Sequence, residues 1–430
     1  MSGRPAAVLA LLVLGAALLA VLALTTPWSP LPGPVPGGRH AVAPLRDFTA
    51  AERAYENAFH RAVRPPAYAG LVAGLVAAGV LGLTPLGARL VERAGRPLGG
   101  GWGWQVVLGG LAVTLVGRLA TLGFDAWAEV VLRRYQLSTQ SWSGWAVDQL
   151  RSLGISAGVL VLALLGFYAL ARAFPRTWWA WVALGGAALV LVASFLYPLL
   201  VEPAFNRFTP LAAGPLRTSL LELAARDGVP VREVLVADAS RRTTALNAYV
   251  SGFGSTRRVV VYDTLLRSAT PAEVRLIVAH ELGHAKRQDV LHGTLEGALG
   301  AAAASCLAFL LISAGPLLRR AGAVGAGDPR SVALLLLLVA AAGVLLTPAS
   351  SLVSRRIEAR ADVHSLELTR DPLTFARIER RLSLANRSDL DPNPVVYGLF
   401  ATHPTGPERI ALARDWARQN GVEPPPALVP

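Results

Sequence analysis

Residues 280–284 read His-Glu-Leu-Gly-His and lie between a polar segment and a long apolar run. On a helix, His280 and His284 are four residues apart and share one face, so their imidazoles can bind one metal ion. Glu281, one step round the helix, can reach a water molecule on that metal and take its proton. The pattern indicates a zinc hydrolase whose metal keeps an open coordination position. The alternative is a histidine pair satisfied inside an ordinary helix.

A catalytic zinc ion usually has three protein ligands, so these two histidines need a partner from another part of the chain. A metzincin-type extension would place a third histidine ten residues after the first, but position 290 is valine. His292 is offset by two residues and cannot be presented in the same way. We expect His292 to be a polar residue at the mouth of a membrane helix.

Two carboxylate pairs with helical spacing offer the next candidates for the third ligand. Glu358 and Asp362 are four residues apart, and on a helix one could bind zinc while the other holds a histidine N–H. Glu367 and Asp371 have the same spacing, but Pro372 follows at once and is expected to end that helix. Glu358 is equally well explained as an exposed carboxylate among arginines, so spacing alone leaves the choice open.

The composition is that of a membrane protein. The chain has 430 residues, of which 53% are hydrophobic and only 16% are charged, whereas about a quarter of a soluble domain is charged. The net charge is +13, and its arginines cluster where apolar runs end. That placement fits lipid head groups and topology signals better than nucleic acid, which we exclude as a partner. The single cysteine, Cys306, excludes a disulfide within one chain.

Seven apolar stretches are long enough to cross a lipid bilayer, which takes about 20 residues. The first stretch follows Arg4, and we expect an uncleaved helix there rather than a signal peptide. The seven predicted spans are Ala6–Leu24, Ala67–Leu86, Trp104–Phe124, Gly154–Ala173, Trp178–Leu200, Thr294–Leu318 and Ser331–Leu352.

The spans divide the chain into five regions. Two crossings separate the polar regions 201–293 and 353–430, so both must lie on the same side of the membrane. The five regions are 1–66 (first helix, a Pro-rich linker and a charged helix over 46–64), 67–200 (spans two to five), 201–293 (the zinc-helix region), 294–352 (spans six and seven) and 353–430 (the C-terminal region).

The first polar region has the pattern of a small α/β unit. Pro215–Asp227 has helical spacing, while Glu233–Ala237 and Arg258–Tyr262 are rich in β-branched residues and predict strands. Asn247–Gly254 is a third candidate strand. Pro271 stands where proline opens a helix, and that helix carries the histidines. We therefore predict a mainly α fold: a seven-helix transmembrane bundle with a small α/β zinc-metalloprotease domain.

Several segments resemble one protein family. The run Ser354–Asp362 reads S-R-R-I-E-A-R-A-D. Together with H-E-L-G-H it resembles the type I CAAX prenyl proteases, which are seven-helix integral membrane zinc endopeptidases of the gluzincin type. Similar segments in the same order extend the resemblance over roughly residues 125–410; they are Phe205–Leu211, Asn247–Gly254, Val261–Leu266, and Thr402–Pro404 with Glu408–Ile410.

The resemblance implies a complete zinc site. His280, His284 and Glu358 would be the metal ligands, with one zinc ion per chain. Glu281 would be the general base that activates water. The choice between the two carboxylate pairs therefore falls on Glu358 through the resemblance.

The resemblance also implies supporting and substrate-binding roles. Asp362 would support the metal site, His403 would lie near the scissile carbonyl, and Asn247 would help to hold the substrate backbone. An extended polypeptide would then pair along the strand over 247–252.

The function that we expect is that of a membrane-embedded zinc metalloendopeptidase acting on membrane-associated or extended polypeptides. A catalytically silent membrane scaffold of the same fold is the alternative, but the intact Glu281 argues against it, since that residue has no ligand role to preserve. A transporter lacks support, because the spans show no discontinuous helix pairs or buried acids. The sequence does not decide between membrane-protein quality control and specific tail processing, nor does it reveal the oligomeric state.

The arginine-for-lysine bias suggests a bacterial cell membrane or another non-prenylating host, where a prenylated tail is not the expected substrate. Basic residues near the ends of the spans occur on both sides of the membrane, and the balance between them is close. Together with the family resemblance, this balance predicts that the zinc regions face the cytoplasm.

Overall fold

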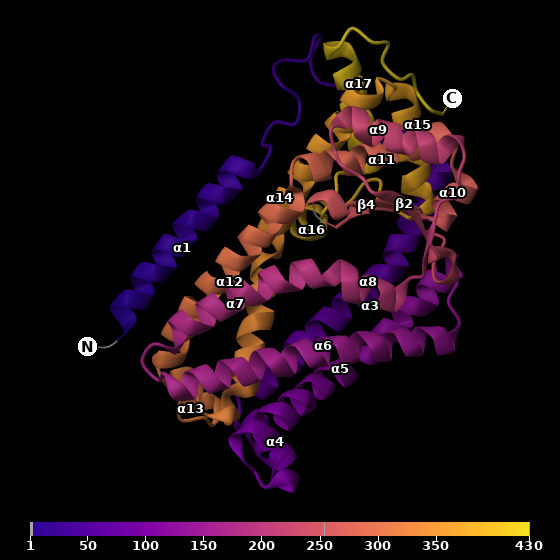
Figure 1. Cartoon of the computed structure of the whole chain (residues 1–430). Coiled ribbons are helices and arrows are strands. Elements are labelled where there is room, and N and C mark those ends of the chain that lie inside the picture. The colour runs from indigo at the N-terminus through magenta and orange to yellow at the C-terminus, as the bar shows by residue number, and fades with distance from the viewer. Residues whose placement is uncertain (1–2, 253, 430) are drawn as a thin grey trace.

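The computed structural model describes residues 3–252 and 254–429. Phe253, part of one family-like segment, lies outside the described residues. The long helices form a bundle, and a smaller sheet-containing unit sits at one end of it (Figure 1). We call this unit, which comprises the four strands with α9–α11 and α15–α17, the cap.

Seven helices among the described residues are long and apolar enough to cross a membrane, as predicted. Apolar side chains such as Leu162 and Leu345 are strongly exposed on them, as expected where lipid covers the surface. The seven are α1 (Arg4–Thr25), α3 (Ala50–Gly82), α5 (Trp102–Arg134), α6 (Trp142–Ala173), α7 (Trp178–Leu196, continued to Phe205 by a π-helical segment, Tyr197–Val201, and α8, Glu202–Phe205), α12 (Asp289–Ser313) and α14 (Val332–Thr369).

Among the described residues, three short α-helices lie outside both the spans and the cap. α2 (Pro44–Asp47) belongs to the linker that follows α1, while α4 (Pro85–Gly95) and α13 (Pro316–Ala321) lie at the end of the bundle opposite the cap (Figure 1).

Helix α3 begins later and extends further than the charged helix expected over 46–64. Its first turn is fixed by a capping box, in which Thr49 and Glu52 each accept a hydrogen bond from the other's backbone N–H. The helix then runs without a break into the second span, although it contains Pro65 and Pro66. Membrane helices tolerate such prolines because neighbouring groups can satisfy the freed carbonyls.

Helix α14 carries the last span into the cap. Its 38 residues give a length of about 57 Å, and it continues past the predicted end at Leu352. The helix stops at Thr369, because Arg370 adopts a left-handed conformation with φ 57°. Asp371 then caps the next helix by accepting a hydrogen bond from the Thr374 N–H at 3.0 Å.

The cap contains a four-stranded sheet in the order β1-β2-β4-β3. β2 (Glu233–Ala237) and β4 (Arg258–Tyr262) are parallel and have the predicted bounds. The third candidate strand is present as β3 (Ala248–Ser251), antiparallel at one edge. β1 (Phe208–Pro210) forms the other edge and was not predicted, because three residues that include proline give no strand pattern.

The helices of the cap enclose α11, which carries the histidine motif. Thr270 and Glu273 form a capping box at its start, and Pro271 is its first residue, as predicted. Leu282 of α11 lies in one buried core with Val259 of the sheet and Trp416 of the C-terminal helix. The cap helices are α9 (Pro215–Asp227), α10 (Asp263–Ser268), α11 (Pro271–Lys286), α15 (Pro372–Ala385), α16 (Pro394–Phe400) and α17 (Gly406–Gln419).

Candidate metal centre

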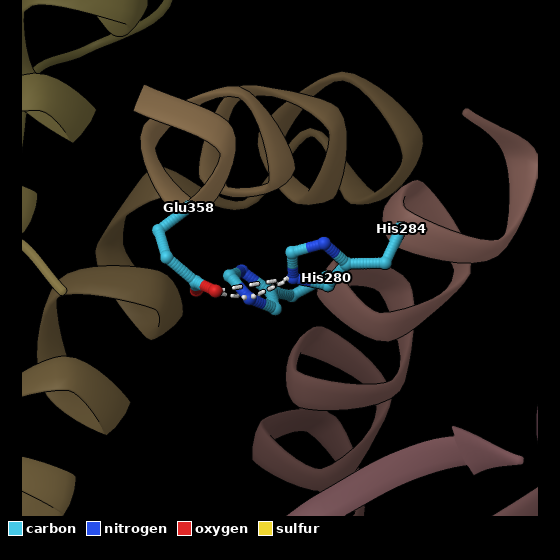
Figure 2. Close-up of side chains that lie close together, drawn as sticks. All are labelled: His280, His284 and Glu358. Atoms are coloured by element: carbon cyan, nitrogen blue, oxygen red, sulfur yellow. Dashed lines mark hydrogen bonds and ion pairs between the residues drawn. The ribbon is translucent and has the colours of Figure 1, made fainter. Parts of the chain in front are cut away.

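Two helices bring three side chains with metal-binding atoms together. Figure 2 shows the Glu358 carboxylate of α14 directed at the imidazoles of His280 and His284 on α11. The His280 Nε2 atom lies 3.1 Å from His284 Nε2 and 3.2 Å from Glu358 Oε2. His284 Nε2 lies 3.7 Å from Glu358 Oε1. The described residues form one such His/Glu cluster that could hold a metal ion.

The spacing of these atoms fits zinc. Four-coordinate zinc has bonds of about 2.0–2.2 Å to nitrogen and oxygen, so neighbouring ligand atoms in a tetrahedron are about 3.3 Å apart. The three separations, 3.1, 3.2 and 3.7 Å, bracket that value. Two imidazoles and one carboxylate are also a common ligand set of catalytic zinc sites, which leave one position open. The residues therefore fit the ion in both chemistry and geometry.

Each histidine is oriented by a carboxylate on its other ring nitrogen. His280 Nδ1 lies 2.9 Å from Asp362 Oδ1, and His284 Nδ1 lies 2.9 Å from Asp289 Oδ2. A carboxylate at Nδ1 holds the proton there and leaves Nε2 free to bind a metal. Asp362 is one turn after Glu358 on α14, and Asp289 opens α12.

Two arginines in turn hold these carboxylates. Arg409 of α17 donates to Asp362 from Nε at 2.8 Å and also pairs with Glu379 at 2.6 Å. Arg360 pairs with Asp289. The Asp362 side chain is fully buried, and that of Arg409 is 14% exposed. Buried charges of this kind are tolerated only when they are paired and hydrogen-bonded, as these are.

The electrostatic field of the site favours a cation. Burial alone lowers the pKa of His280, but hydrogen bonds that its imidazole donates to the carboxylates of Asp362 and Glu358 outweigh burial and raise the pKa to about 10. Burial opposes charge on His284 in the same way, yet Asp289 and Glu358 raise its pKa to about 9. A field that stabilises a proton on each imidazole would also stabilise a metal ion between them.

Gly283, inside the histidine motif, lets α11 and α14 approach each other. A Cβ atom at this position would lie 3.0 Å from Cδ2 of His364 on α14, closer than side chains normally pack. Because Glu358 comes from α14, the distance between these two helices decides whether its carboxylate reaches the histidines. The motif thus contributes packing as well as ligands.

The cluster opens into a cavity of about 740 Å³ between the sheet and the C-terminal helices. Glu281 lines this cavity, and in the described part of the chain its carboxylate makes no hydrogen bond or ion pair. Burial raises the pKa of the Glu281 carboxyl above its ordinary value. The side chain is therefore available to accept a proton from a molecule in the cavity.

His403 and Asn247 also line the cavity. His403 lies between α16 and α17, and its Nε2 atom is 3.4 Å from Glu358 Oε2 while the side chain stays 60% exposed. Asn247 precedes β3, and its carbonyl accepts a hydrogen bond from the Tyr262 N–H at 3.0 Å. All seven residues singled out in the sequence thus border the cavity or support the cluster. Glu367 and Asp371, the rival carboxylate pair, do not share a helix and are absent from the cluster.

Sequence reasoning missed Asp289, Glu379 and the role of Arg409. Asp289 follows His284 by five residues, across a turn in which Gln288 has a positive φ of 56°. No helical spacing links the two residues, so only the folded structure reveals their contact. In the sequence, Arg409 is only part of a family-like segment, and no pattern distinguishes Glu379.

Comparison with known proteins agrees with this site. The sequence model of peptidase family M48 matches residues 210–417, and that of the CAAX prenyl protease N-terminal region, with five membrane helices, matches residues 75–207. YhfN of Bacillus subtilis, an uncharacterized metalloprotease, is 33% identical over 310 residues, which are 70% of this chain and 71% of that protein. A rice CAAX prenyl protease 1 homolog is 32% identical over 53% of this chain and 54% of its own length.

This chain belongs to the type I CAAX prenyl protease family. CAAX prenyl protease 1 of Saccharomyces cerevisiae is 31% identical, but the match covers only 34% of this chain and 33% of that protein. The crystal structure of S. mikatae Ste24p has the same fold, with a TM-score of 0.64 at 22% identity over 76% of this chain and 80% of that one.

The chain is thus a member of a family of membrane metalloproteases, and its seven apolar helices are those of a multi-pass membrane protein. The family implies a polypeptide substrate and a metal, and the seven apolar helices imply a lipid bilayer.

Proposed function

We propose that this protein is a zinc endopeptidase that hydrolyses peptide bonds of membrane-associated or extended polypeptides. The observation that carries the proposal is the convergence of His280 Nε2, His284 Nε2 and the Glu358 carboxylate at separations of 3.1–3.7 Å. The carboxylates on both Nδ1 atoms support it further, because a histidine fixed in that tautomer is ready to bind a metal.

Glu281 is the general base of the proposed reaction. A zinc ion held by the three ligands would act as a Lewis acid on the substrate carbonyl and on a water molecule. Glu281 faces the same cavity, has no other partner among the described residues, and has a pKa raised by burial. A base whose pKa lies nearer to neutral pH accepts the proton of the attacking water and passes it to the leaving amine more effectively.

His403 and Asn247 act on the substrate. The exposed imidazole of His403, 3.4 Å from Glu358, is suited to donate a hydrogen bond to the oxyanion that forms at the scissile carbonyl. The Asn247 side chain is exposed at the cavity beside the edge strand β3. A polypeptide that adds to this edge is recognised mainly through its backbone, so we propose a broad sequence specificity.

We further propose that the protein resides in a bacterial cell membrane with the cap in the cytoplasm. The similarity to a Bacillus subtilis protein and the arginine-rich composition support a bacterial host. The basic residues at the ends of the spans support a cytoplasmic position of the cap.

Cleavage of an unstructured protein by detergent-purified Glu281→Gln tests the proposed function. We expect the variant to keep its zinc and to lose about 10²–10⁴ in turnover, the usual contribution of a general base. Glu222→Gln is the matched control, since Glu222 is exposed on α9, away from the cavity. Wild-type protein that binds zinc without cleaving any polypeptide would identify a silent scaffold, and substantial turnover by Glu281→Gln would reject the general-base assignment.

A further inference from the structure

The edge strand β3 offers only alternate residues to a substrate. β3 pairs with β4 on one side, with Ala248 opposite Val261. The Asn247 carbonyl accepts from the Tyr262 N–H, so Asn247 directs its backbone groups toward β4. In an antiparallel ladder this direction alternates, and the backbone groups of Ala248, and those of residues 246 and 250, point to the opposite, open edge.

At Leu246 the open edge is already occupied. The Leu246 N–H donates to Asn386 Oδ1 at 2.8 Å, and Asn386 Nδ2 donates to the Leu246 carbonyl at 3.0 Å. One side-chain amide thus satisfies both backbone groups of one residue. A residue of an antiparallel partner strand would make the same pair of bonds. Asn386 takes the position that a substrate backbone would occupy.

Asn386 is held firmly in this position. It is the C-terminal cap of α15, and the next residue, Arg387, has a positive φ of 56° that turns the chain away from the helix. The Arg387 guanidinium pairs with Glu56 on α3 at 3.0 Å, and its carbonyl contacts His60 Nε2 at 2.9 Å. The loop that presents Asn386 is therefore fixed to a membrane-spanning helix.

Both partners of this contact line the cavity of the metal cluster. A peptide that pairs with β3 beside the cluster can bond to Ala248 and to residue 250. The next pairing position, Leu246, lies two residues along the strand, about 7 Å further. There the peptide meets the Asn386 side chain and has to leave the sheet.

We propose that Asn386 is a specificity-determining residue that limits how many substrate residues pair with β3. This inference rests on the proposed peptidase function and deepens it. It predicts that, in the direction of Leu246, only a few substrate residues form backbone hydrogen bonds with β3. Substrate residues beyond Asn386 form no backbone hydrogen bonds with this strand.

The test uses full-length protein and a nested set of unstructured peptides, extended one residue at a time from either end. Peptide Kd is measured in a Glu281→Gln background, so the readout does not depend on turnover. With Asn386 present, we expect affinity to stop rising at a fixed length on one side. Asn386→Ala should move this limit by about two residues and tighten binding of the longer peptides about ten-fold, as two further backbone hydrogen bonds would.

Asn386→Leu distinguishes two roles of the Asn386 side chain: blocking the edge of β3 against further substrate residues, and linking the α15 end to Leu246 by hydrogen bonds. Leucine has a similar size but forms no hydrogen bonds, so it should keep the length limit while losing the link to Leu246. Asn393→Ala is the control, because Asn393 caps α16 and does not line the cavity.

An unchanged length limit in Asn386→Ala, or a limit that moves equally in Asn386→Leu, would overturn the inference. Failure of the wild type to cleave any peptide, while the shift in the binding limit is observed, would reject the proposed function and leave the role of Asn386 intact.

Discussion

Asp362→Asn is expected to weaken zinc binding although Asp362 is not a ligand. One carboxylate oxygen, Oδ1, accepts from His280 Nδ1 at 2.9 Å and also from a terminal N–H of Arg409, while Oδ2 accepts from Arg409 Nε at 2.8 Å. Asparagine keeps one oxygen, and the permanently charged Arg409 requires an acceptor. The single remaining oxygen carries no negative charge and is shared with Arg409, so it holds the Nδ1 proton of His280 less firmly, and the tautomer with its proton on Nε2 gains in population. That nitrogen is then blocked for the metal.

The size of the effect follows from burial. Loss of a carboxylate that orients a metal-binding histidine costs 10–100-fold in metal affinity. The Asp362 side chain is fully buried, whereas Asp289, which holds His284, is 12% exposed. We expect about 100-fold for Asp362→Asn and about 10-fold for Asp289→Asn, which correspond to about 2.7 and 1.4 kcal/mol.

Zinc Kd, measured by competition with a chromophoric chelator, checks both values. Asp415→Asn is a matched control, because Asp415 contacts His40 Nδ1 at 2.8 Å and is also buried, but neither residue lines the cavity. Thermal unfolding confirms that each variant is folded. An Asp362→Asn protein that is folded and binds zinc as tightly as the wild type would refute the tautomer argument.

Three further predictions concern the ligand, the packing and the orientation. Glu358→Ala should lose bound zinc while Glu367→Ala keeps it, and equal metal contents would contradict the choice of ligand. Gly283→Ala should push α14 away by a few tenths of an ångström and lower zinc affinity without unfolding the cap; unchanged affinity would show that the contact with His364 yields freely. Reporter fusions at Gly325 and at the C-terminus should lie on opposite sides of the membrane, with the C-terminal reporter active in the cytoplasm; activity only outside the cell would reverse the proposed orientation.

The sequence was sufficient for those parts of the fold whose signals are local. The spans, the strands β2 and β4 and the start of α11 each depend on hydropathy, β-branching or a capping pattern within a short window. The charged helix expected over 46–64 was bounded incorrectly, because neither its start at Ala50 nor its passage through Pro65 follows from composition.

The metal site, too, has a part that local sequence signals predict and a part that they do not. The spacing of His280 and His284 predicts a shared helix face, but which carboxylate joins them depends on the packing of α14 against α11. Spacing alone could not separate Glu358 from Glu367, since both lie on the same long helix. Asp289 and Asn386 act through turns, where the chain direction changes and side-chain periodicity carries no information.

The most direct test of the proposed metal centre is X-ray anomalous scattering at the zinc edge from crystals of the purified protein. A single peak is expected about 2.0–2.2 Å from His280 Nε2, His284 Nε2 and a Glu358 oxygen. A peak bound to other side chains, or no peak in protein that cleaves polypeptides, would contradict the account.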